Sequence, residues 1–407
     1  MTGARIAVEA IHQGGGVGGA PVSLLKLLGS LDASTFAPRA TFTEPGPILS
    51  YASAQHVPAS VVPTGGAFFY SAHARLSARG VARFLRGYPA AVLTAQRHLR
   101  RSRPDLLHLN TSVLLPWATA AARERVPVLW MAREVLGPNP VLRSVHSRFM
   151  LRHARRVVAI SGAVRDCFPV SARVEVIPNA VDLREFSLAL LGERAAIRAE
   201  IGVDVDERVI MAVGSVQLPK GHWLLLDAFE QLHRRDPRAR LVLVCGGVDP
   251  SYRQSRRGRL KQALGLPMDA LDALLRDAAR RGLQGQITVT GFRRDVARIL
   301  AAADVLAFPS LEPEGFGRPL IEAMAMARPV VATAVGPSAE IVGPDSGRVV
   351  PSRAAALADA IGSILEDPVM AKRMGCHGRA RVEALFSQER QTRQMERMYR
   401  EVLETRD

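Results

Sequence analysis

Two glutamates, Glu314 and Glu322, stand eight positions apart in the segment SLEPEGFGRPLIEAMAM, which covers residues 310–326. Gly315 and Gly317 lie between them, just ahead of a helical pattern. Glycines let backbone amides approach an anion closely, and the N-terminus of a helix favours negative charge. The segment therefore predicts an anion cradle with carboxylates beside it. A diphosphate attached to a group rich in hydroxyls would suit both parts.

Short apolar runs of the kind found in buried strands lie on both sides of this segment, at 305–309 and 329–332. A strand, loop, helix and strand in this order form half of a doubly wound parallel sheet, whose ligands bind at the carboxyl ends of the strands. Similar runs recur in both halves of the chain, with helical spans between most of them. They are residues 6–10, 39–43, 106–109, 128–131, 157–160, 209–213, 241–245 and 287–290. The sequence thus predicts an α/β protein with two parallel sheets.

Near the N-terminus, Gly14, Gly16 and Gly19 have the spacing G-x-G-x-x-G between a strand and a helix. The spacing indicates a turn that approaches a phosphate or substrate closely. With Glu44 at the end of the second strand, it would also suit an NAD(P)-dependent oxidoreductase. That alternative explains nothing in the second half of the chain.

The composition is that of a globular protein with room for two cores, with 407 residues, of which 48% are hydrophobic and 23% charged. No apolar run approaches the roughly 18 residues that a membrane-spanning helix needs, and no secretion leader is recognised, so we expect a cytoplasmic protein. Cys167, Cys245 and Cys376 lack the spacing of a metal site. We expect three buried thiols.

The net charge of +16 is concentrated in the first half, where residues 1–182 hold 21 Lys or Arg against 9 Asp or Glu. A stretch without acidic residues, 45–104, contains four arginines at helical spacing, namely Arg75, Arg79, Arg83 and Arg86. Such a helix predicts either peripheral contact with an anionic membrane or a solvated arginine face. Nucleic acid is not expected as a partner, because no recognition motif accompanies the charge.

Several motifs in this order resemble the family 4 glycosyltransferases, and the likeness runs over nearly the whole chain. The motifs are the E-x7-E pair Glu314 and Glu322 with its glycines, the pair Lys220-Gly221, the GGAP turn at 18–21, the PNAVD segment at 178–182, and the turn from Gly336 to Glu340. The resemblance implies the GT-B fold, in which two Rossmann-like domains face each other across a cleft. It implies an acceptor-binding domain at 1–184, a nucleotide-sugar-binding domain at 185–385, and a helix at 386–407 that crosses back to the first domain.

The resemblance also implies roles for single residues at the donor site. Lys220 would meet the diphosphate, Glu314 and the amides of 315–317 would hold the sugar and the distal phosphate, and Glu322 would bind the ribose. Residues 291–293 would lie beside the nucleobase. The implied donor-binding set is Gly18, Gly19, Ser215, Lys220, Gly291, Phe292, Arg293, Glu314, Gly315, Phe316, Gly317, Arg318 and Glu322.

The implied reaction is retaining transfer of a hexose from a nucleotide diphosphate sugar to an acceptor hydroxyl, on a lipid-linked or polysaccharide glycan. Lys220, Glu314, Asn110 and Arg133 would act in catalysis without a metal or a resident cofactor. Asn110 and Arg133, which stand where the family often has histidine, would line the acceptor side together with Glu134.

The chain also departs from the family where arginine is usual and Ser215 stands here. We expect Arg318 or Arg293 to replace that cation. His108 lies within a strand, where a packed histidine is expected.

Other interpretations of the same residues remain open. A noncatalytic sugar-nucleotide-binding protein would share the motifs, and two glutamates could serve glycoside hydrolysis. Residues 204–206 form a D-x-D sequence, a motif that holds a metal in another glycosyltransferase fold. Here we interpret it as a solvated loop.

Overall fold

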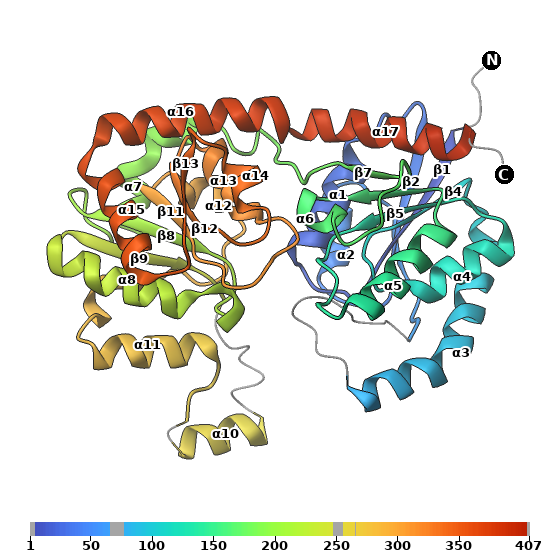
Figure 1. The fold of residues 1–407 in the computed structure, drawn as a ribbon, viewed down its shortest axis with the longest axis horizontal. Helices are drawn as coiled ribbons and strands as arrows, with labels where there is room; N and C mark the ends of the chain where they lie inside the picture. Colours follow the sequence, from blue (N-terminus) through green and yellow to red (C-terminus); the bar gives the residue numbers. More distant parts are fainter. Residues whose placement is uncertain (1–4, 66–76, 247–254, 265, 405–407) are drawn as a thin grey trace. The chain divides into compact units, whose positions relative to one another are not determined.

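The computed structural model describes residues 5–65, 77–246, 255–264 and 266–404 (Figure 1). The chain forms two compact units. Unit 1 contains Met1–Ala180, Glu314–Phe316 and Gln388–Asp407, and unit 2 contains Val181–Pro313 and Gly317–Ser387. The sequence predicted domain limits after residues 184 and 385. The main divisions between the two units fall after Ala180 and after Ser387.

Unit 1 is built on a seven-stranded parallel sheet with the order β3-β2-β1-β4-β5-β6-β7. Its strands are β1 (Ile6–His12), β2 (Phe36–Phe42), β3 (Ala59–Val61), β4 (Leu106–Leu109), β5 (Val128–Ala132), β6 (Arg156–Ala159) and β7 (Val174–Val176). The central strands β4 and β5 are buried along their whole length. Burial on both faces explains why they read as continuous apolar runs.

The helices of unit 1 are α1 (Gly19–Ser30), α2 (Ile48–Ala54), α3 (Ala78–Ser102), α4 (Leu115–Glu124), α5 (Pro140–His153), α6 (Gly162–Arg165) and α17 (Gln388–Glu404). The last of them packs on α1, β4 and β5, which confirms the predicted return of the C-terminal helix to the first domain. The hydroxyl of Tyr399 lies 2.7 Å from Nδ1 of His108, and both side chains are buried. His108 is therefore packed against the returning helix, as expected.

Unit 2 contains a six-stranded parallel sheet with the order β10-β9-β8-β11-β12-β13. Its strands are β8 (Arg208–Val213), β9 (Ala239–Val244), β10 (Ile287–Val289), β11 (Val305–Phe308), β12 (Val330–Thr333) and β13 (Gly347–Val350). Its α-helices are α7 (Arg194–Glu200), α8 (His222–Arg235), α10 (Arg256–Ala263), α11 (Ala270–Arg280), α12 (Val296–Leu300), α13 (Arg318–Ala325), α14 (Ser338–Val342), α15 (Ala354–Glu366) and α16 (Pro368–Leu385). Short 3-10 helices are η1 (Leu188–Glu193), η2 (Leu218–Lys220) and η3 (Gln284–Gln286).

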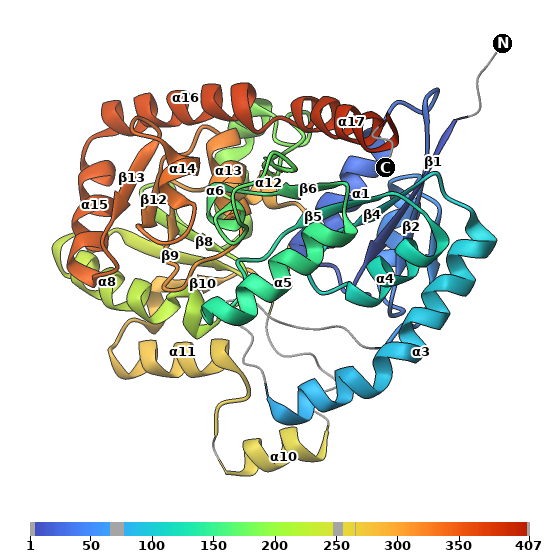
Figure 2. The ribbon, with the colours of Figure 1, turned by 45° about the vertical axis from the view of Figure 1, so that its right-hand side comes forward.

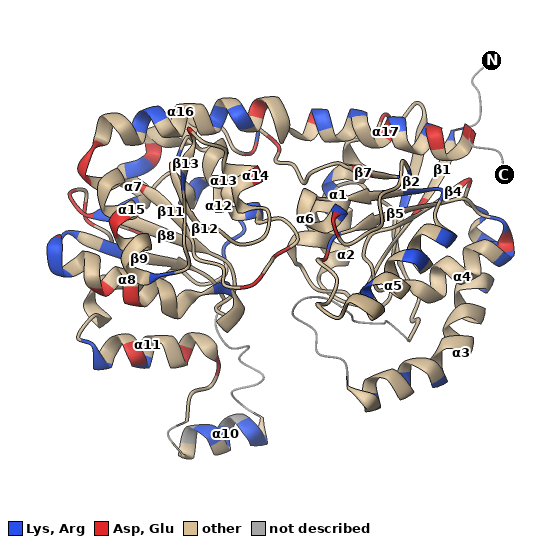
Figure 3. Cartoon of the chain, viewed as in Figure 1, with Lys and Arg blue, Asp and Glu red and all other residues tan. Residues whose placement is uncertain are grey.

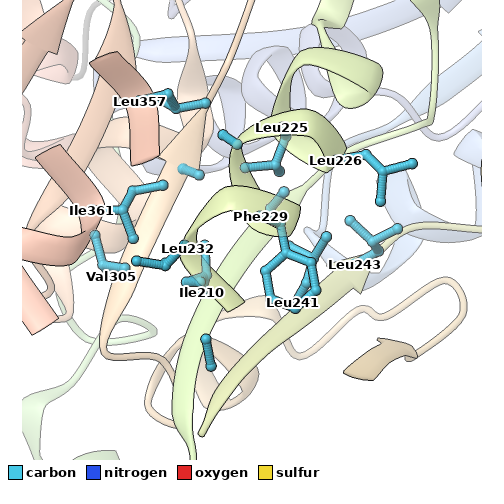
Figure 4. Packing of buried hydrophobic residues seen from close by; sticks show 14 of the residues in the cluster. Ile210, Leu225, Leu226, Phe229, Leu232, Leu241, Leu243, Val305, Leu357 and Ile361 are labelled. Carbon is cyan, nitrogen blue, oxygen red and sulfur yellow. The ribbon is translucent and has the colours of Figure 1, made fainter. Parts of the chain in front are cut away.

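The core of unit 2 lies between its sheet and the pair α8 and α15 (Figure 4). Leu225 and Phe229 of α8 pack against strand residues such as Ile210, and Ile361 of α15 closes the cluster. Each fully buried side chain of this size contributes about 1.5–3 kcal/mol to folding. This packing fixes α8, and with it the loop that joins β8 to α8.

Each sheet has a point where successive connections leave in opposite directions. It lies between β1 and β4 in unit 1 and between β8 and β11 in unit 2. Doubly wound sheets bind ligands beyond the carboxyl ends of the strands at this point. Most of the residues singled out by the sequence follow these four strands or their neighbours, whereas residues 291–293 follow β10 at the edge of the sheet of unit 2.

One expectation about the cysteines was wrong. Cys167 and Cys245 are buried, but Cys376 is exposed. It lies on α16, a helix that was not predicted from the sequence and whose outer face is solvated. Among the described residues, no helix is long and apolar enough to cross a membrane.

Candidate functional site

Lys220 lies in η2, in the loop that follows β8 of unit 2. This loop is fastened to the loop that follows β11, because the carbonyl of Pro219 accepts a hydrogen bond of 2.8 Å from the N–H of Leu311. Gly221 then turns with a φ of +69°, and a Cβ at this position would stand 1.9 Å from the carbonyl oxygen of Pro309. A glycine is therefore required here, and it locks the two loops together.

The ammonium group of Lys220 has no carboxylate partner among the described residues. Its Nζ lies 3.4 Å from the position that a Cβ on Gly214 would occupy, at the carboxyl end of β8. His222 begins α8 nearby, and burial lowers its pKa to about 4, so this imidazole is neutral near pH 7. Lys220 is therefore a cation that a bound anion could neutralise.

Glu322 is held on α13, where 7% of its surface is exposed. Arg318, one turn earlier on the same helix, forms an ion pair with it at 2.8 Å. Gly317 precedes α13 with a φ of +101°, and a Cβ there would stand 3.1 Å from Cζ of Phe308. The carboxylate is thus fixed in the second turn of the helix that follows β11.

The turn after β10 supplies the three residues expected beside a nucleobase. Gly291 has a φ of +77°, and Phe292 exposes 64% of its surface. Arg293 binds Asp295 through Nε at 2.8 Å and Glu200 through Nη2 at 2.8 Å. The hydrogen bond from Asp295 and then that from Glu200 raise the pKa of the Arg293 guanidinium above its usual range.

Ser215 stands where the family usually has an arginine, and the contacts of Arg318 and Arg293 bear on whether either can replace that cation. Ser215 is exposed, and its hydroxyl accepts a hydrogen bond from Gln217 at 3.1 Å. Both arginines expected to compensate, Arg318 and Arg293, already have carboxylate partners in unit 2. Either would have to share or exchange a partner to bind a diphosphate, whereas Lys220 would not.

The glycine-rich loop of unit 1 joins β1 to α1. Gly14 has a φ of +83°, and a Cβ on Gly15 would lie 2.4 Å from the carbonyl oxygen of Pro45. Gly18 is the N-cap of α1 and Gly19 is its first residue. The loop therefore brings the N-terminus of a 12-residue helix to the carboxyl edge of the sheet, a position that favours an anion.

Asn110 and Arg133 follow the neighbouring strands β4 and β5, and the structure brings them together. Nε of Arg133 donates to Oδ1 of Asn110 at 2.7 Å, and Nη1 of Arg133 donates to Oδ1 of Asn179 at 2.8 Å. Asn110 in turn lies 2.9 Å from Nδ1 of His12 through its Nδ2. All four side chains are buried.

The protonation state of His12 follows from this network. Because Oδ1 of Asn110 accepts from Arg133, its amide nitrogen is left to donate to His12, and Nδ1 of His12 must be unprotonated. Burial, and then the charge of Arg133, lower the pKa of His12 to about 3. His12 is therefore a neutral imidazole that carries its proton on Nε2.

Two further groups of unit 1 complete this edge. Glu134 accepts from the backbone N–H and the hydroxyl of Ser112 at 2.9 and 2.6 Å. The residues Glu314–Phe316 cluster with unit 1, where the hydroxyl of Ser161 donates to the carbonyl of Gly315 at 2.7 Å. A Cβ on Gly315 would stand 2.0 Å from the carbonyl oxygen of Arg133, so only glycine fits there too.

His12 and Asn179 were not predicted as parts of a candidate site. His12 ends β1, just before the glycine-rich loop, and a histidine at that position was the available signal. Asn179 lies within the PNAVD segment, which was named only as a family motif, without a role for its side chains. Among the described residues, no group of three or more His, Cys, Asp or Glu could hold a metal ion.

Two family models match the chain. The model described as Glycosyltransferase Family 4 matches residues 51–185, and the model described as Glycosyl transferases group 1 matches residues 207–367. The chain belongs to the family 4 glycosyltransferases. The family resemblance predicted from the motifs is thereby confirmed.

Relatives and solved structures agree with this assignment. A D-inositol 3-phosphate glycosyltransferase of Nocardia farcinica is 32% identical over 300 residues, which are 67% of this chain and 61% of the relative. One of Mycobacterium tuberculosis is 33% identical over 213 residues, which are 49% of this chain and 38% of the relative. The chain thus spans less than two thirds of the length of these relatives.

Among solved structures, that of Anabaena HepE in complex with UDP and glucose has a TM-score of 0.76 and 22% identity, covering 97% of this chain and 99% of the other. A glycosyltransferase of Rickettsia africae has a TM-score of 0.76 and 20% identity, covering 99% and 100%. These likenesses concern the fold. The two Rossmann-like units are those of a GT-B protein, as predicted.

Proposed function

We propose that this family member transfers a hexose from a nucleotide diphosphate sugar to an acceptor hydroxyl, with retention of the anomeric configuration and without a metal ion. The observation that carries the proposal is the position of Lys220. It is a cation without a carboxylate partner among the described residues, and Gly221 locks its loop to the loop that leads to α13.

The chemistry needs a group that stabilises the departing diphosphate. Breaking the bond between sugar and phosphate increases negative charge on the phosphate oxygens, and a fixed ammonium group stabilises this charge more as the bond stretches. Lys220 is assigned this role, with the amides of 315–317 beside the distal phosphate. Glu314 is assigned to the sugar hydroxyls and Glu322 to the ribose.

Retention is proposed to follow from attack on the face that the diphosphate leaves. The acceptor hydroxyl then forms the new glycosidic bond while the bond to the phosphate oxygen breaks, and that oxygen takes the hydroxyl proton. No nucleophile from the protein is required. Gly18 and Gly19 are assigned to the diphosphate because they begin α1, whose N-terminus favours an anion.

The buried network of unit 1 is assigned to the acceptor side. Arg133 orients Asn110, and Asn110 fixes the tautomer of His12, so that Nε2–H of His12 is a hydrogen-bond donor. A neutral donor suits a hydroxyl or an ether oxygen of a glycan. We propose a lipid-linked or polysaccharide acceptor. The names of the relatives add D-inositol 3-phosphate as an acceptor to be tested beside it.

A panel of nucleotide sugars tests the donor assignment. A donor present at about 100 times its Kd should add about 2.7 kcal/mol to the stability of the folded state and so raise the melting temperature. The stabilising donor is then incubated with the acceptors, and the anomeric configuration of the product is read by NMR. An inverted product contradicts the proposed mechanism, and binding without turnover for every acceptor favours a noncatalytic binding protein.

We also propose that α3 of unit 1 contacts an anionic membrane surface. The first half of this helix projects from the sheet, and Arg79, Arg83 and Arg86 are exposed on it (Figure 2). Leu85 exposes 63% of its surface between them, and α3 contains no acidic residue (Figure 3). Arg75, the fourth arginine of the predicted face, lies outside the described residues.

Sedimentation with vesicles rich in anionic lipid tests this contact. Each arginine near such a surface contributes about 1 kcal/mol, so the double change Arg79→Glu and Arg83→Glu should weaken binding at least about tenfold. The control is Arg97→Glu with Arg101→Glu, the same charge change at exposed positions in the second half of α3. Equal losses in both variants would mean that only the net charge matters and would refute a specific contact by this face.

A further inference from the structure

A pocket lies in unit 2 at the amino ends of its strands, the edge opposite to Lys220. Arg208 begins β8, Asp304 directly precedes β11, and Pro329 directly precedes β12, and all three line it. The pocket has a volume of about 580 Å³. Since the nucleotide site of such a sheet lies at the carboxyl ends, this pocket is separate from the proposed donor site.

Cations outnumber carboxylates in the lining. The basic residues are Arg194, Arg198, Arg208, Arg328 and Lys372, and the acidic residues are Asp206, Glu207 and Asp304. Arg208 is neutralised from outside the lining by Asp236 at 2.7 Å, and Glu207 by Arg240 at 2.9 Å.

The remaining positive charge is concentrated around Asp304. Its two carboxylate oxygens hold Arg194 and Arg198, the latter at 2.7 Å, so one carboxylate serves two guanidinium groups. Arg328 and Lys372 have no carboxylate partner among the described residues. Asp206, which is exposed, is the acidic residue that remains to offset them.

Arg328 carries the clearest sign of a missing partner. Its Nη2 donates to the carbonyl of Ala301 at 2.8 Å, but its Nε is buried without a hydrogen-bond partner in the part of the chain that the structure describes. Burial, and then the charge of Arg194, lower the pKa of Arg328 to about 10. A buried guanidinium with an unsatisfied N–H is costly, and an anion would supply both the charge and the acceptor.

Part of the pocket wall is apolar. It consists of Leu188, Leu191, Ile364, Leu365, Pro368 and Ala371. An inorganic anion would leave this wall in contact with water, whereas an organic group attached to the anion would cover it.

We propose that this pocket binds a phosphate monoester, with the phosphate between Arg328, Arg194 and Lys372 and the organic part against the apolar wall. The phosphate offers several acceptor oxygens and a charge close to −2 near neutral pH, which matches three cations of which Arg194 alone has a carboxylate partner among the described residues.

Cys376 provides a direct readout, because it lines the pocket and is exposed, whereas the other two cysteines are buried. Burial also raises the pKa of Cys245 to about 11 and raises that of Cys167, so neither thiol competes near pH 7.5. The intact protein is alkylated with iodoacetamide, and the rate at Cys376 is measured by peptide mass spectrometry. Phenyl phosphate, inorganic phosphate and benzyl alcohol are compared at constant ionic strength, set with potassium chloride.

Phenyl phosphate should slow alkylation of Cys376 at least about fivefold at saturation, at a concentration about tenfold lower than inorganic phosphate requires, because only the ester also covers apolar surface. No protection by phenyl phosphate overturns the proposal. Protection by inorganic phosphate at the same concentration would show that the ligand need not be a phosphate monoester. Equal protection by benzyl alcohol would show that the negative charge of the ligand plays no role.

A matched pair of variants on α16 locates the effect. Lys372 and Arg373 are adjacent and exposed, but only Lys372 lines the pocket. Lys372→Glu should remove the protection, and Arg373→Glu, with the same change of charge, should retain it. Equal behaviour of the two variants would show that phenyl phosphate acts elsewhere, which includes the donor site.

Discussion

Replacing Gly221 by alanine tests whether the loop that carries Lys220 is held in place by the close contact with Pro309. The substitution has two effects. The left-handed backbone at φ +69° costs a residue with a Cβ about 1–2 kcal/mol. In addition, the Cβ would stand 1.9 Å from a backbone carbonyl oxygen, so the two loops must separate by more than an ångström to restore van der Waals contact.

Gly202 provides a control for the first effect alone. It has a φ of +68°, and a Cβ there would have no atom within 4 Å. Gly202→Ala should therefore lower the free energy of unfolding of unit 2 by about 1–2 kcal/mol and leave donor affinity unchanged. Gly221→Ala should lower stability by more than that, and it should weaken donor binding at least about tenfold, since an ångström of displacement removes a charge-assisted contact.

Urea denaturation gives the stabilities, and isothermal titration with the donor found in the nucleotide-sugar panel gives the affinities. If Gly221→Ala and Gly202→Ala bind the donor equally well, the contact between the two loops does not position Lys220. If both variants lose the same stability, the loops separate freely and the contact with Pro309 is not a constraint.

Two further predictions concern pH and metal ions. Burial lowers the pKa of His108 to about 3, so the unfolded chain binds a proton below about pH 6.5 that the folded chain does not, and stability should fall by up to about 2 kcal/mol for this residue between pH 6.5 and 5. His108→Gln, which can still bond the hydroxyl of Tyr399, should reduce that slope in urea titrations, and an unchanged slope would show that His108 is protonated in the folded state. Treatment with EDTA should leave hexose transfer intact, whereas a loss of activity that manganese restores would contradict metal independence.

Most of the fold could be predicted from the sequence because parallel strands buried on both faces are short apolar runs. β4 was predicted with the observed limits, and β8 and β11 within one residue. α16 was not anticipated, since its buried face includes the glycines Gly375 and Gly378, which do not contribute to an apolar helical pattern. The exposed position of Cys376 follows from that helix and could not be predicted without it.

Only those residues of the candidate site that lie in local motifs could be predicted from the sequence. Lys220, Gly221 and Glu322 lie in segments whose spacing marks a strand, a loop and a helix. The partners of Arg293 and the link from His12 to Asn110 join residues far apart in the chain, as do the residues around Arg328. Which side chains meet at a sheet edge depends on strand order, and the order of the strands is not written in any one segment.

The central claim is tested most directly by the turnover of Lys220→Ala with the donor that the panel identifies. Arg373→Ala, which removes an exposed cation of the same unit, serves as the control. Loss of one preorganised group that stabilises the leaving diphosphate should lower kcat by roughly 100-fold or more, with the control unchanged. A kcat for Lys220→Ala equal to that of the parent protein would contradict the account.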